Sequence, residues 1–316
     1  MELGYALSSE EHSPADLVRH AQAAEQAGFG FGLISDHIHP WIDAQGHSAF
    51  VWSVLGSIAQ ATAGFRVGTG VTCPLIRIHP AIVAHAAATV ACLMPGRFFL
   101  GVGTGENLNE HVTGAKWPAA DERLAMLEEA VGLMRKLWEG DYVTHRGEHY
   151  TVENLRIFDL PDEPVEIAVA AMQPQAAELA GRIGDALVNV APKEEIIGKF
   201  DESGGKGKPK YGQITVCYAK SKDEAKRTAF EVWPNALVEG SASQELPLPS
   251  DFEELTKERD ADELDGTLTL GPDPDEYLEQ VKRYDEAGYT HAYFHQIGPD
   301  QDTFLEFARD ELLPRV

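Results

Sequence analysis

The sequence is poor in cysteine, in metal-binding motifs and in long apolar runs. Its three cysteines, Cys73, Cys92 and Cys217, are scattered without metal-ligand spacing, which indicates free thiols in a cytoplasmic protein. No HExxH, P-loop or cysteine-based metal pattern occurs, so we expect no metal site. No apolar run approaches the roughly 18 residues of a membrane span. The acidic start at residues 1–5 leads directly into a predicted strand, so we expect no signal peptide and no membrane partner.

Basic residues are also scarce relative to acidic ones. Lys and Arg number 26 against 51 Asp and Glu, which gives a formal net charge of −25. The acids are spread over many predicted helices and therefore indicate solvated helix faces. Such a surface repels nucleic acid and anionic membranes, so neither is expected as a partner. It is also typical of a high-salt cytoplasm, where screening relieves the self-repulsion, and it suggests a halophilic source as a hypothesis.

Short apolar runs alternate with amphipathic segments along all 316 residues. We expect strands at 3–7, 30–34, 66–71, 97–102, 165–170, 186–190, 211–218, 268–270 and 292–295. We expect helices at 14–27, 50–62, 80–93, 119–139, 174–182, 193–200, 223–233, 274–287 and 302–313. About eight strand–helix units suit parallel strands joined by right-handed crossovers. The sequence therefore predicts an α/β fold, a single (β/α)8 TIM barrel over residues 1–316, with a doubly wound open sheet as the alternative.

Two segments interrupt this alternation. Residues 140–163 contain two short strand-like runs, which predict an inserted hairpin. Residues 235–266 are rich in proline, serine and acids, with one short helix expected at 251–258. A segment of this length in a compact domain is typically a lid or an excursion over a site.

Polar side chains gather where three neighbouring predicted strands end. The stretch 34–41, Ile-Ser-Asp-His-Ile-His-Pro-Trp, is followed by strand ends at 70–74 and 104–106. The carboxyl ends of barrel strands carry ligand sites, so His37 and Glu106 are expected at one cavity. An imidazole and a carboxylate there are suited to general acid–base catalysis. Taken alone, the Asp-His stretch favours a polar turn beside a packed tryptophan, and the repeated pattern at neighbouring strand ends is what points to a site.

The glycines at 101, 103 and 105 do not form a dinucleotide-binding motif. They alternate instead of following G-x-G-x-x-G, and no ribose-binding acid follows at the required distance of about 20 residues. They allow either close backbone approach to a planar ligand or a tight turn. Gly70 lies inside a strand pattern, which indicates a bulge, a close ligand contact or packing between barrel layers.

Several motifs resemble those of the luciferase-like TIM-barrel oxidoreductases. They are Leu-Gly-Tyr at 3–5, Ser-Asp-His at 35–37 with Pro-Trp at 40–41, and Phe-Leu-Gly-Val-Gly-Thr-Gly-Glu at 99–106 with Leu-Asn-Glu at 108–110. The resemblance is greatest to the branch around the glucose-6-phosphate dehydrogenases that use coenzyme F420, an 8-hydroxy-5-deazaflavin. It covers residues 1–200 and 267–316.

The resemblance implies a set of site residues. The implied coenzyme contacts are Asp36, Gly70, Val71, Cys73, Thr104, Gly105 and Asn109, with a cis peptide bond between Gly70 and Val71 behind the deazaflavin ring. His37 and Glu106 match the family's catalytic pair, Trp41 its active-site indole, and Glu10 a further acidic residue of the site. One of His37 and Glu106 would be base and the other acid as hydride moves between a carbinol carbon and the deazaflavin C5. Members of the branch are commonly homodimers, so a homodimer is expected.

The sequence departs from the branch where a sugar phosphate would bind. The phosphate clamp retains Lys193, but Val190 occupies a threonine position and Thr267 an arginine position. The glycine pair that admits the coenzyme tail is Met172-Gln173 here. One lysine in so acidic a protein holds a phosphate dianion weakly. The departures therefore predict an uncharged alcohol, sugar or carbonyl substrate in place of glucose 6-phosphate.

Three functions follow from these observations. The favoured one is an F420-dependent dehydrogenase or reductase acting on CH–OH groups. The alternatives are an FMN-dependent luciferase-like monooxygenase and a ligand-binding barrel without catalysis. Deazaflavin and FMN differ in absorption and fluorescence, and only reduced FMN consumes oxygen readily, so the bound coenzyme distinguishes them.

Overall fold

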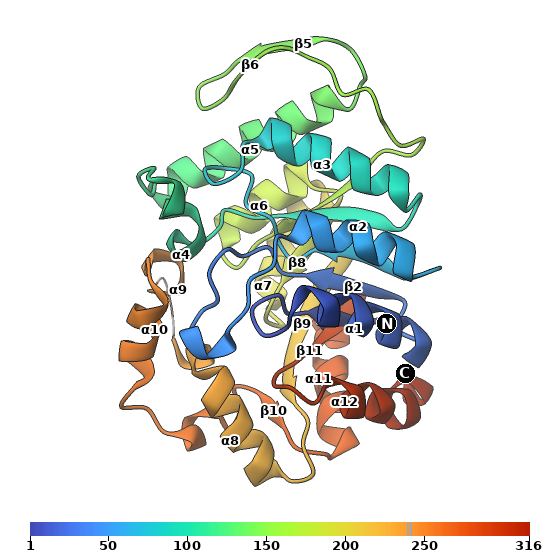
Figure 1. Cartoon of the computed structure of the whole chain (residues 1–316), viewed down its shortest axis with the longest axis vertical. Coiled ribbons are helices and arrows are strands. Elements are labelled where there is room, and N and C mark those ends of the chain that lie inside the picture. The colour runs from blue at the N-terminus through green and yellow to red at the C-terminus, as the bar shows by residue number, and fades with distance from the viewer. Residues whose placement is uncertain (239, 241) are drawn as a thin grey trace.

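The computed structural model describes residues 1–238, 240 and 242–316, and its centre is a closed parallel barrel (Figure 1). The barrel strands are β1 (Glu2–Leu7), β2 (Phe31–Ile34), β3 (Arg66–Thr69), β4 (Phe98–Val102), β7 (Glu166–Ala170), β8 (Ala186–Asn189), β9 (Lys210–Cys217) and β11 (His291–Gln296). Each pairs in parallel with its neighbours in the order β11-β1-β2-β3-β4-β7-β8, and pairing of β8 with β9 and of β9 with β11 closes the ring. The predicted TIM barrel is confirmed, and the doubly wound alternative is wrong.

Helices surround the barrel on its outside (Figure 1). They are α1 (Pro14–Ala27), α2 (Val51–Ala61), α3 (Pro80–Leu93), α5 (Ala120–Leu137), α6 (Pro174–Ile183), α7 (Glu194–Phe200), α8 (Lys222–Val232), α11 (Pro274–Glu286) and α12 (Gln301–Phe307). Local sequence signals determine α1. Its start is capped by Ser13, which accepts from the Asp16 N–H, and its end is set by Gly28 at φ 106°.

Shorter elements lie outside this pattern. The hairpin of β5 (Val143–Arg146) and β6 (Thr151–Leu155) lies beyond α5 at the top of Figure 1. The helices α4 (Asn107–Glu110), α9 (Ala242–Glu245) and α10 (Pro249–Thr256) lie at the carboxyl ends of the strands. β10 (Thr269–Leu270) pairs with the last residues of β9 and is not a barrel strand, which reduces the nine expected strands to eight in the ring. No helix in the described part of the chain is long and apolar enough to cross a membrane.

Aromatic rings fill the lower half of the barrel. Phe99 and Tyr211 stack with ring centroids 5.2 Å apart, and Phe31 packs against the Tyr211 edge. Gly68 makes this possible, because a Cβ there would lie 2.2 Å from the Phe99 ring. Phe31, Phe99 and Tyr211 together close the barrel interior at the amino ends of the strands. The space for a ligand inside the barrel is therefore at the carboxyl ends.

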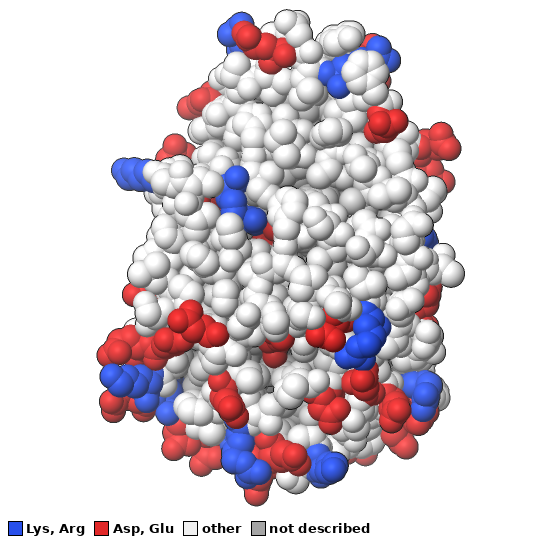
Figure 2. All heavy atoms as spheres, viewed as in Figure 1, with Lys and Arg blue, Asp and Glu red and all other residues white. Residues whose placement is uncertain are grey.

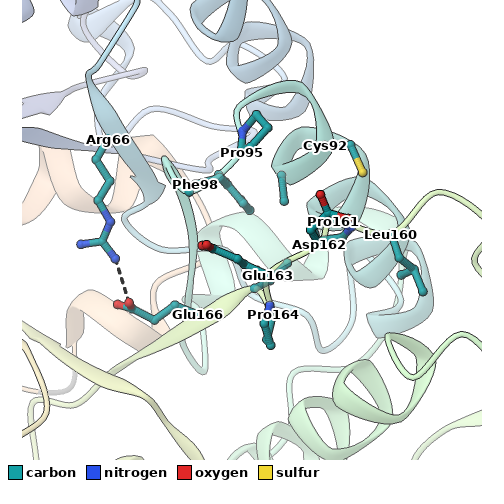
Figure 3. Close-up of a pocket in the computed structure, with 13 residues that line it drawn as sticks. Arg66, Cys92, Pro95, Phe98, Leu160, Pro161, Asp162, Glu163, Pro164 and Glu166 are labelled. Atoms are coloured by element: carbon teal, nitrogen blue, oxygen red, sulfur yellow. Dashed lines mark hydrogen bonds and ion pairs between the residues drawn. The ribbon is translucent and has the colours of Figure 1, made fainter.

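A hollow of about 410 Å³ lies at the opposite, amino-terminal end of the strands (Figure 3). Its wall contains the Arg66–Glu166 ion pair, 2.8 Å between Nη2 and Oε2, which joins the first residues of β3 and β7. Arg66 also donates to the Tyr211 hydroxyl at 2.7 Å. Residues at this end of a TIM barrel stabilise the fold, because the active sites of such barrels lie at the other end. We therefore assign this ion pair a structural role.

Candidate active site

A cavity of about 440 Å³ opens at the carboxyl ends of the barrel strands. Nine of the residues predicted for the site line it: Glu10, His37, Trp41, Gly70, Val71, Gly105, Glu106, Met172 and Val190. Six others do not line it: Asp36, Cys73, Thr104, Asn109, Gln173 and Lys193. The three strand ends recognised in the sequence thus converge, together with residues from β1, β7 and β8.

His37 is held against a buried carboxylate. Its Nδ1 lies 3.3 Å from Glu10 Oε1 and 3.3 Å from the carbonyl oxygen of His39. Glu10 accepts hydrogen bonds from Ser35 at 2.6 Å and from Ser8 at 3.1 Å. Burial acts to raise the pKa of Glu10, but His37 and the Ser35 hydroxyl outweigh it, so the pKa lies below its usual value. An ionised Glu10 fixes the proton of neutral His37 on Nδ1 and leaves Nε2 as the basic atom.

Trp41 connects His37 to helix α10 of the expected lid segment. Its ring packs edge-on against His37, with centroids 5.0 Å apart, and against Phe252 of α10 at 5.3 Å. The Trp41 N–H donates to Gln45 Oε1 at 2.8 Å, and Gln45 Nε2 donates to the Val232 carbonyl at 3.0 Å. Residues 235, 236, 238, 243, 244 and 252 also line the cavity. These described residues of the segment 235–266 therefore form one side of the site.

The ends of β3 and β4 form a wall of close backbone contacts. The peptide bond between Gly70 and Val71 is cis, as the family resemblance predicts. Gly105 has φ 72°, and a Cβ there would lie 2.6 Å from Cys73 Sγ. A larger residue at 105 would therefore be strained and would also collide. This wall presents backbone and the Val71 side chain to the cavity.

Asp36 lies behind this wall and forms part of a buried ion cluster. Its carboxylate accepts from Arg77 Nη2 at 3.0 Å and from the Thr72 hydroxyl at 2.7 Å. Arg77 also donates to Glu110, from its backbone N–H at 2.8 Å and from Nε at 3.3 Å. Burial raises the pKa of Glu110, and the Arg77 contacts offset this only in part. The cluster braces the loops after β2, β3 and β4, whereas the sequence interpretation had placed Asp36 toward the coenzyme.

Asn109 holds a buried donor without a protein partner. Its Oδ1 accepts from the N–H groups of Ile38 at 2.9 Å and His39 at 3.1 Å. Within the described residues its buried Nδ2 has no hydrogen-bond partner. Such a group is costly unless a ligand or water satisfies it. Asn109 is one of the positions at which the resemblance implies a coenzyme contact.

Sequence reasoning missed Arg77, Gln213 and His295. Arg77 lies in the run 74–83, whose other residues are apolar apart from His79, a pattern that indicates a buried, paired arginine. Gln213 and Thr215 alternate with Ile214 and Val216 on β9, a pattern typical of a strand with one face toward the barrel interior. His295 is followed directly by Gln296 on β11 and gives no such signal. The described residues contain no group of three His, Cys, Asp or Glu side chains that could hold a metal ion.

Comparison with known proteins places the chain in a family. A model of the luciferase-like monooxygenase family matches residues 1–291. The chain therefore belongs to the luciferase-like family. It is similar to the F420-dependent glucose-6-phosphate dehydrogenase of Beutenbergia cavernae, 37% identical over 327 residues that cover 100% of this chain and 97% of the relative. The enzyme of the same name from Mycobacterium avium is 36% identical over 331 residues, 100% of this chain and 98% of the relative.

Solved structures give the same picture. An F420-dependent secondary alcohol dehydrogenase, in complex with an F420–acetone adduct, superposes with a TM-score of 0.91 at 30% identity and covers 98% of both chains. The F420-dependent tetrahydromethanopterin reductase of Methanopyrus kandleri superposes with a TM-score of 0.78 at 20% identity, over 100% of this chain and 99% of that one. The second likeness concerns the fold alone.

The ion cluster around Arg77 gives a test of the wall's stability. Replacing Arg77 by Met leaves Asp36 and Glu110 buried without their cation, so we expect the free energy of unfolding to fall by roughly 3–5 kcal/mol. The matched control is Arg19→Met, which breaks a half-exposed pair with Asp302 and should cost less than about 1 kcal/mol. Denaturant unfolding measures both. Equal losses in the two variants would contradict the assigned role.

Proposed function

We propose that this chain transfers hydride between an uncharged alcohol or carbonyl substrate and coenzyme F420. The observation that carries the proposal is the charge of the cavity. Among its described lining residues there is no Lys or Arg, whereas Glu10 and Glu106 both line it. A phosphate dianion would therefore meet two carboxylates and no cation, which is unfavourable for binding.

Lys193 and Arg77 do not alter this charge balance. Lys193, retained from the family's phosphate clamp, stands at the start of α7 and does not line the cavity. Arg77 is committed to Asp36 and Glu110. Val190, at the clamp's threonine position, presents an apolar side chain that is 45% exposed. These residues favour a neutral substrate over glucose 6-phosphate.

The chain is an F420-dependent dehydrogenase, as are its relatives. The cavity fits a flat deazaflavin, because its wall combines the cis Gly70–Val71 peptide with the apolar side chains of Val71, Ala170 and Met172. The buried Nδ2 of Asn109, which has no partner among the described residues, is a further candidate donor for the coenzyme, although Asn109 does not line the cavity. When bound, the deazaflavin supplies a hydride acceptor at C5 and no ready route to oxygen activation.

The contacts of His37 support its role as the base in alcohol oxidation. Its Nε2 would take the hydroxyl proton as the carbinol carbon releases hydride, and the ionised Glu10 would stabilise the resulting imidazolium. Trp41 packs on His37 and restricts the orientation of the ring. Glu106, from the end of β4, would exchange the proton of the reduced coenzyme. In carbonyl reduction the same groups act in reverse.

Glucose and glucose 6-phosphate form a matched substrate pair that differs only in the phosphate. With saturating F420, we expect hydride transfer from secondary alcohols and glucose, and kcat/KM for glucose 6-phosphate at least about tenfold lower than for glucose, equivalent to about 1.4 kcal/mol. The loss of oxidised-coenzyme absorbance measures the rate. A preference for glucose 6-phosphate would overturn the neutral-substrate proposal. Oxygen consumption with reduced FMN would instead support the monooxygenase alternative.

We also propose a homodimer formed through an uncharged face. From Ala44 to Gly105 the chain contains no Asp or Glu, and neither α2 nor α3 carries a charged residue. Figure 2 shows this face as the broad white area in the middle of the view, with acidic side chains gathered below it. Ile82 of α3 is 59% exposed there. A twofold interface places a surface against its own copy, and in a chain of charge −25 this face repels its copy least.

Salt and one substitution test this assembly together with the proposed halophilic source. In about 2 M KCl, where the Debye length is only about 3 Å or less, we expect a dimer by light scattering and a higher melting temperature than in dilute buffer. Ile82→Glu should give monomers at the same salt concentration, whereas the exposed-face control Ile38→Glu should remain dimeric. A monomeric wild type at high salt would contradict the dimer. Undiminished stability in dilute buffer would contradict the halophilic assignment.

A further inference from the structure

Three polar side chains line the side of the cavity that faces the proposed catalytic residues. Asn189 ends β8, Gln213 lies on β9 and His295 on β11, and all three line the cavity. In the closed ring of eight strands, β8 lies four strands from β2, which positions His37. Likewise β9 lies four strands from β3, and β11 four strands from β4. We call Asn189, Gln213 and His295 the far wall.

Asn189 presents a donor in a fixed orientation. Its Oδ1 accepts from the N–H groups of Val190 at 2.6 Å and Ala191 at 3.0 Å. The remaining amide atom must therefore be the NH2 group. Asn189 is only 2% exposed, and its Nδ2 has no hydrogen-bond partner within the described residues. A buried donor left unpaired in a cavity wall is costly unless a ligand or water satisfies it, so this NH2 group is a candidate contact for a ligand.

Gln213 presents an acceptor, because its neighbours occupy its amide protons. Glu11 accepts from the Gly298 N–H at 2.8 Å and lies 3.4 Å from His295 Nε2. A carboxylate only accepts, so Nε2 carries the imidazole proton and Nδ1 is an acceptor. Gln213 Nε2 lies 3.4 Å from that Nδ1 and 3.1 Å from the Thr215 hydroxyl. Both amide protons are thereby used, and Oε1 is available to a ligand.

The order of residues after β1 explains this arrangement. Glu10 and Glu11 are consecutive, and β1 lies between β2 and β11 in the ring. Glu10 contacts His37 after β2, whereas Glu11 contacts His295 on β11. One carboxylate orients the proposed base, and the other orients the far wall through His295.

We propose that Asn189 and Gln213 form an amide subsite for a second hydroxyl of the substrate. An alcohol hydroxyl both accepts and donates, so it matches one fixed donor and one fixed acceptor without net charge. This inference rests on the proposed hydride transfer and narrows its substrate class. The substrate is an uncharged polyhydroxy compound, a polyol or sugar, whose reacting hydroxyl meets His37 while another hydroxyl binds the far wall. His295 is a positioning residue that acts through Gln213.

The closest comparison uses a monohydric alcohol and a polyol on the same variants. Gln213→Met keeps the side-chain length and removes the acceptor. Asn189→Asp keeps the acceptor for the Val190 and Ala191 N–H groups and removes the donor. We expect each variant to lose at least about tenfold in kcat/KM for glycerol or glucose, since one hydrogen bond of this kind contributes about 1.4 kcal/mol. Gln213→Met should therefore lower the ratio of kcat/KM for the polyol to kcat/KM for 2-propanol, a change that a general loss of activity would not produce.

The affinity for the polyol, measured without turnover, is a second test of the same variants. Calorimetric titration of glycerol or glucose into the wild-type complex with oxidised F420, at a pH where turnover is slow, should show weaker binding in both variants. Equal losses for 2-propanol and the polyol, or a wild type that prefers 2-propanol, would overturn the subsite. A weaker affinity of Asn189→Asp for F420, with polyol binding unchanged, would assign the donor to the coenzyme instead. Absence of hydride transfer from every alcohol would contradict the proposed function itself, and polyol binding by calorimetry would then still decide the subsite.

Discussion

A buried carboxylate beside an imidazole, Glu10 against His37, is the contact on which the arrangement of the cavity depends. Burial raises the pKa of Glu10, but the His37 imidazole and the Ser35 hydroxyl outweigh it and keep the pKa below its usual value. The ionised carboxylate in turn determines which nitrogen of His37 is basic. Trp41 fixes the ring from one side and links it to α10 through Phe252. The His37 imidazole is therefore in contact with the loop after β1 through Glu10, and with α10 through Trp41 and Phe252.

Charge is distributed in this molecule for three different purposes. The outer surface carries a large excess of acids, whereas α2 and α3 carry none. Inside, Arg77 neutralises Asp36 and Glu110 behind the cavity wall and is not available to a ligand. The described cavity lining keeps two carboxylates and lacks cations. This charge distribution is the basis of the proposal that the substrate is uncharged, in contrast to the sugar phosphate named for the relatives.

Local signals in the sequence predicted most of the fold. Ser13, Pro14 and Gly28 mark the ends of α1, and the alternation of apolar and amphipathic segments predicts the barrel. The convergence of His37 and Glu106 follows from their positions at strand ends. The sequence position of Asp36 does not predict where its side chain points. Consecutive residues of an extended chain face opposite sides, and its partner Arg77 lies on another loop. The far wall was not predicted because the contacts that orient Gln213 and His295 form only when β9, β11 and the Glu11 loop are adjacent in space.

Single-turnover hydride transfer tests the central claim most directly. Enzyme loaded with oxidised F420 is mixed with a secondary alcohol bearing hydrogen or deuterium at the carbinol carbon, and the oxidised-coenzyme absorbance is followed. Because the carbinol C–H bond breaks as hydride leaves, wild type should show a slower transfer with deuterium. His37→Ala should bind F420 with unchanged affinity yet lose at least about 100-fold in rate, within the range of general-base catalysis. Undiminished transfer in His37→Ala would contradict the role of His37 as base. The absence of transfer from any uncharged alcohol in wild type would contradict the proposed hydride transfer itself.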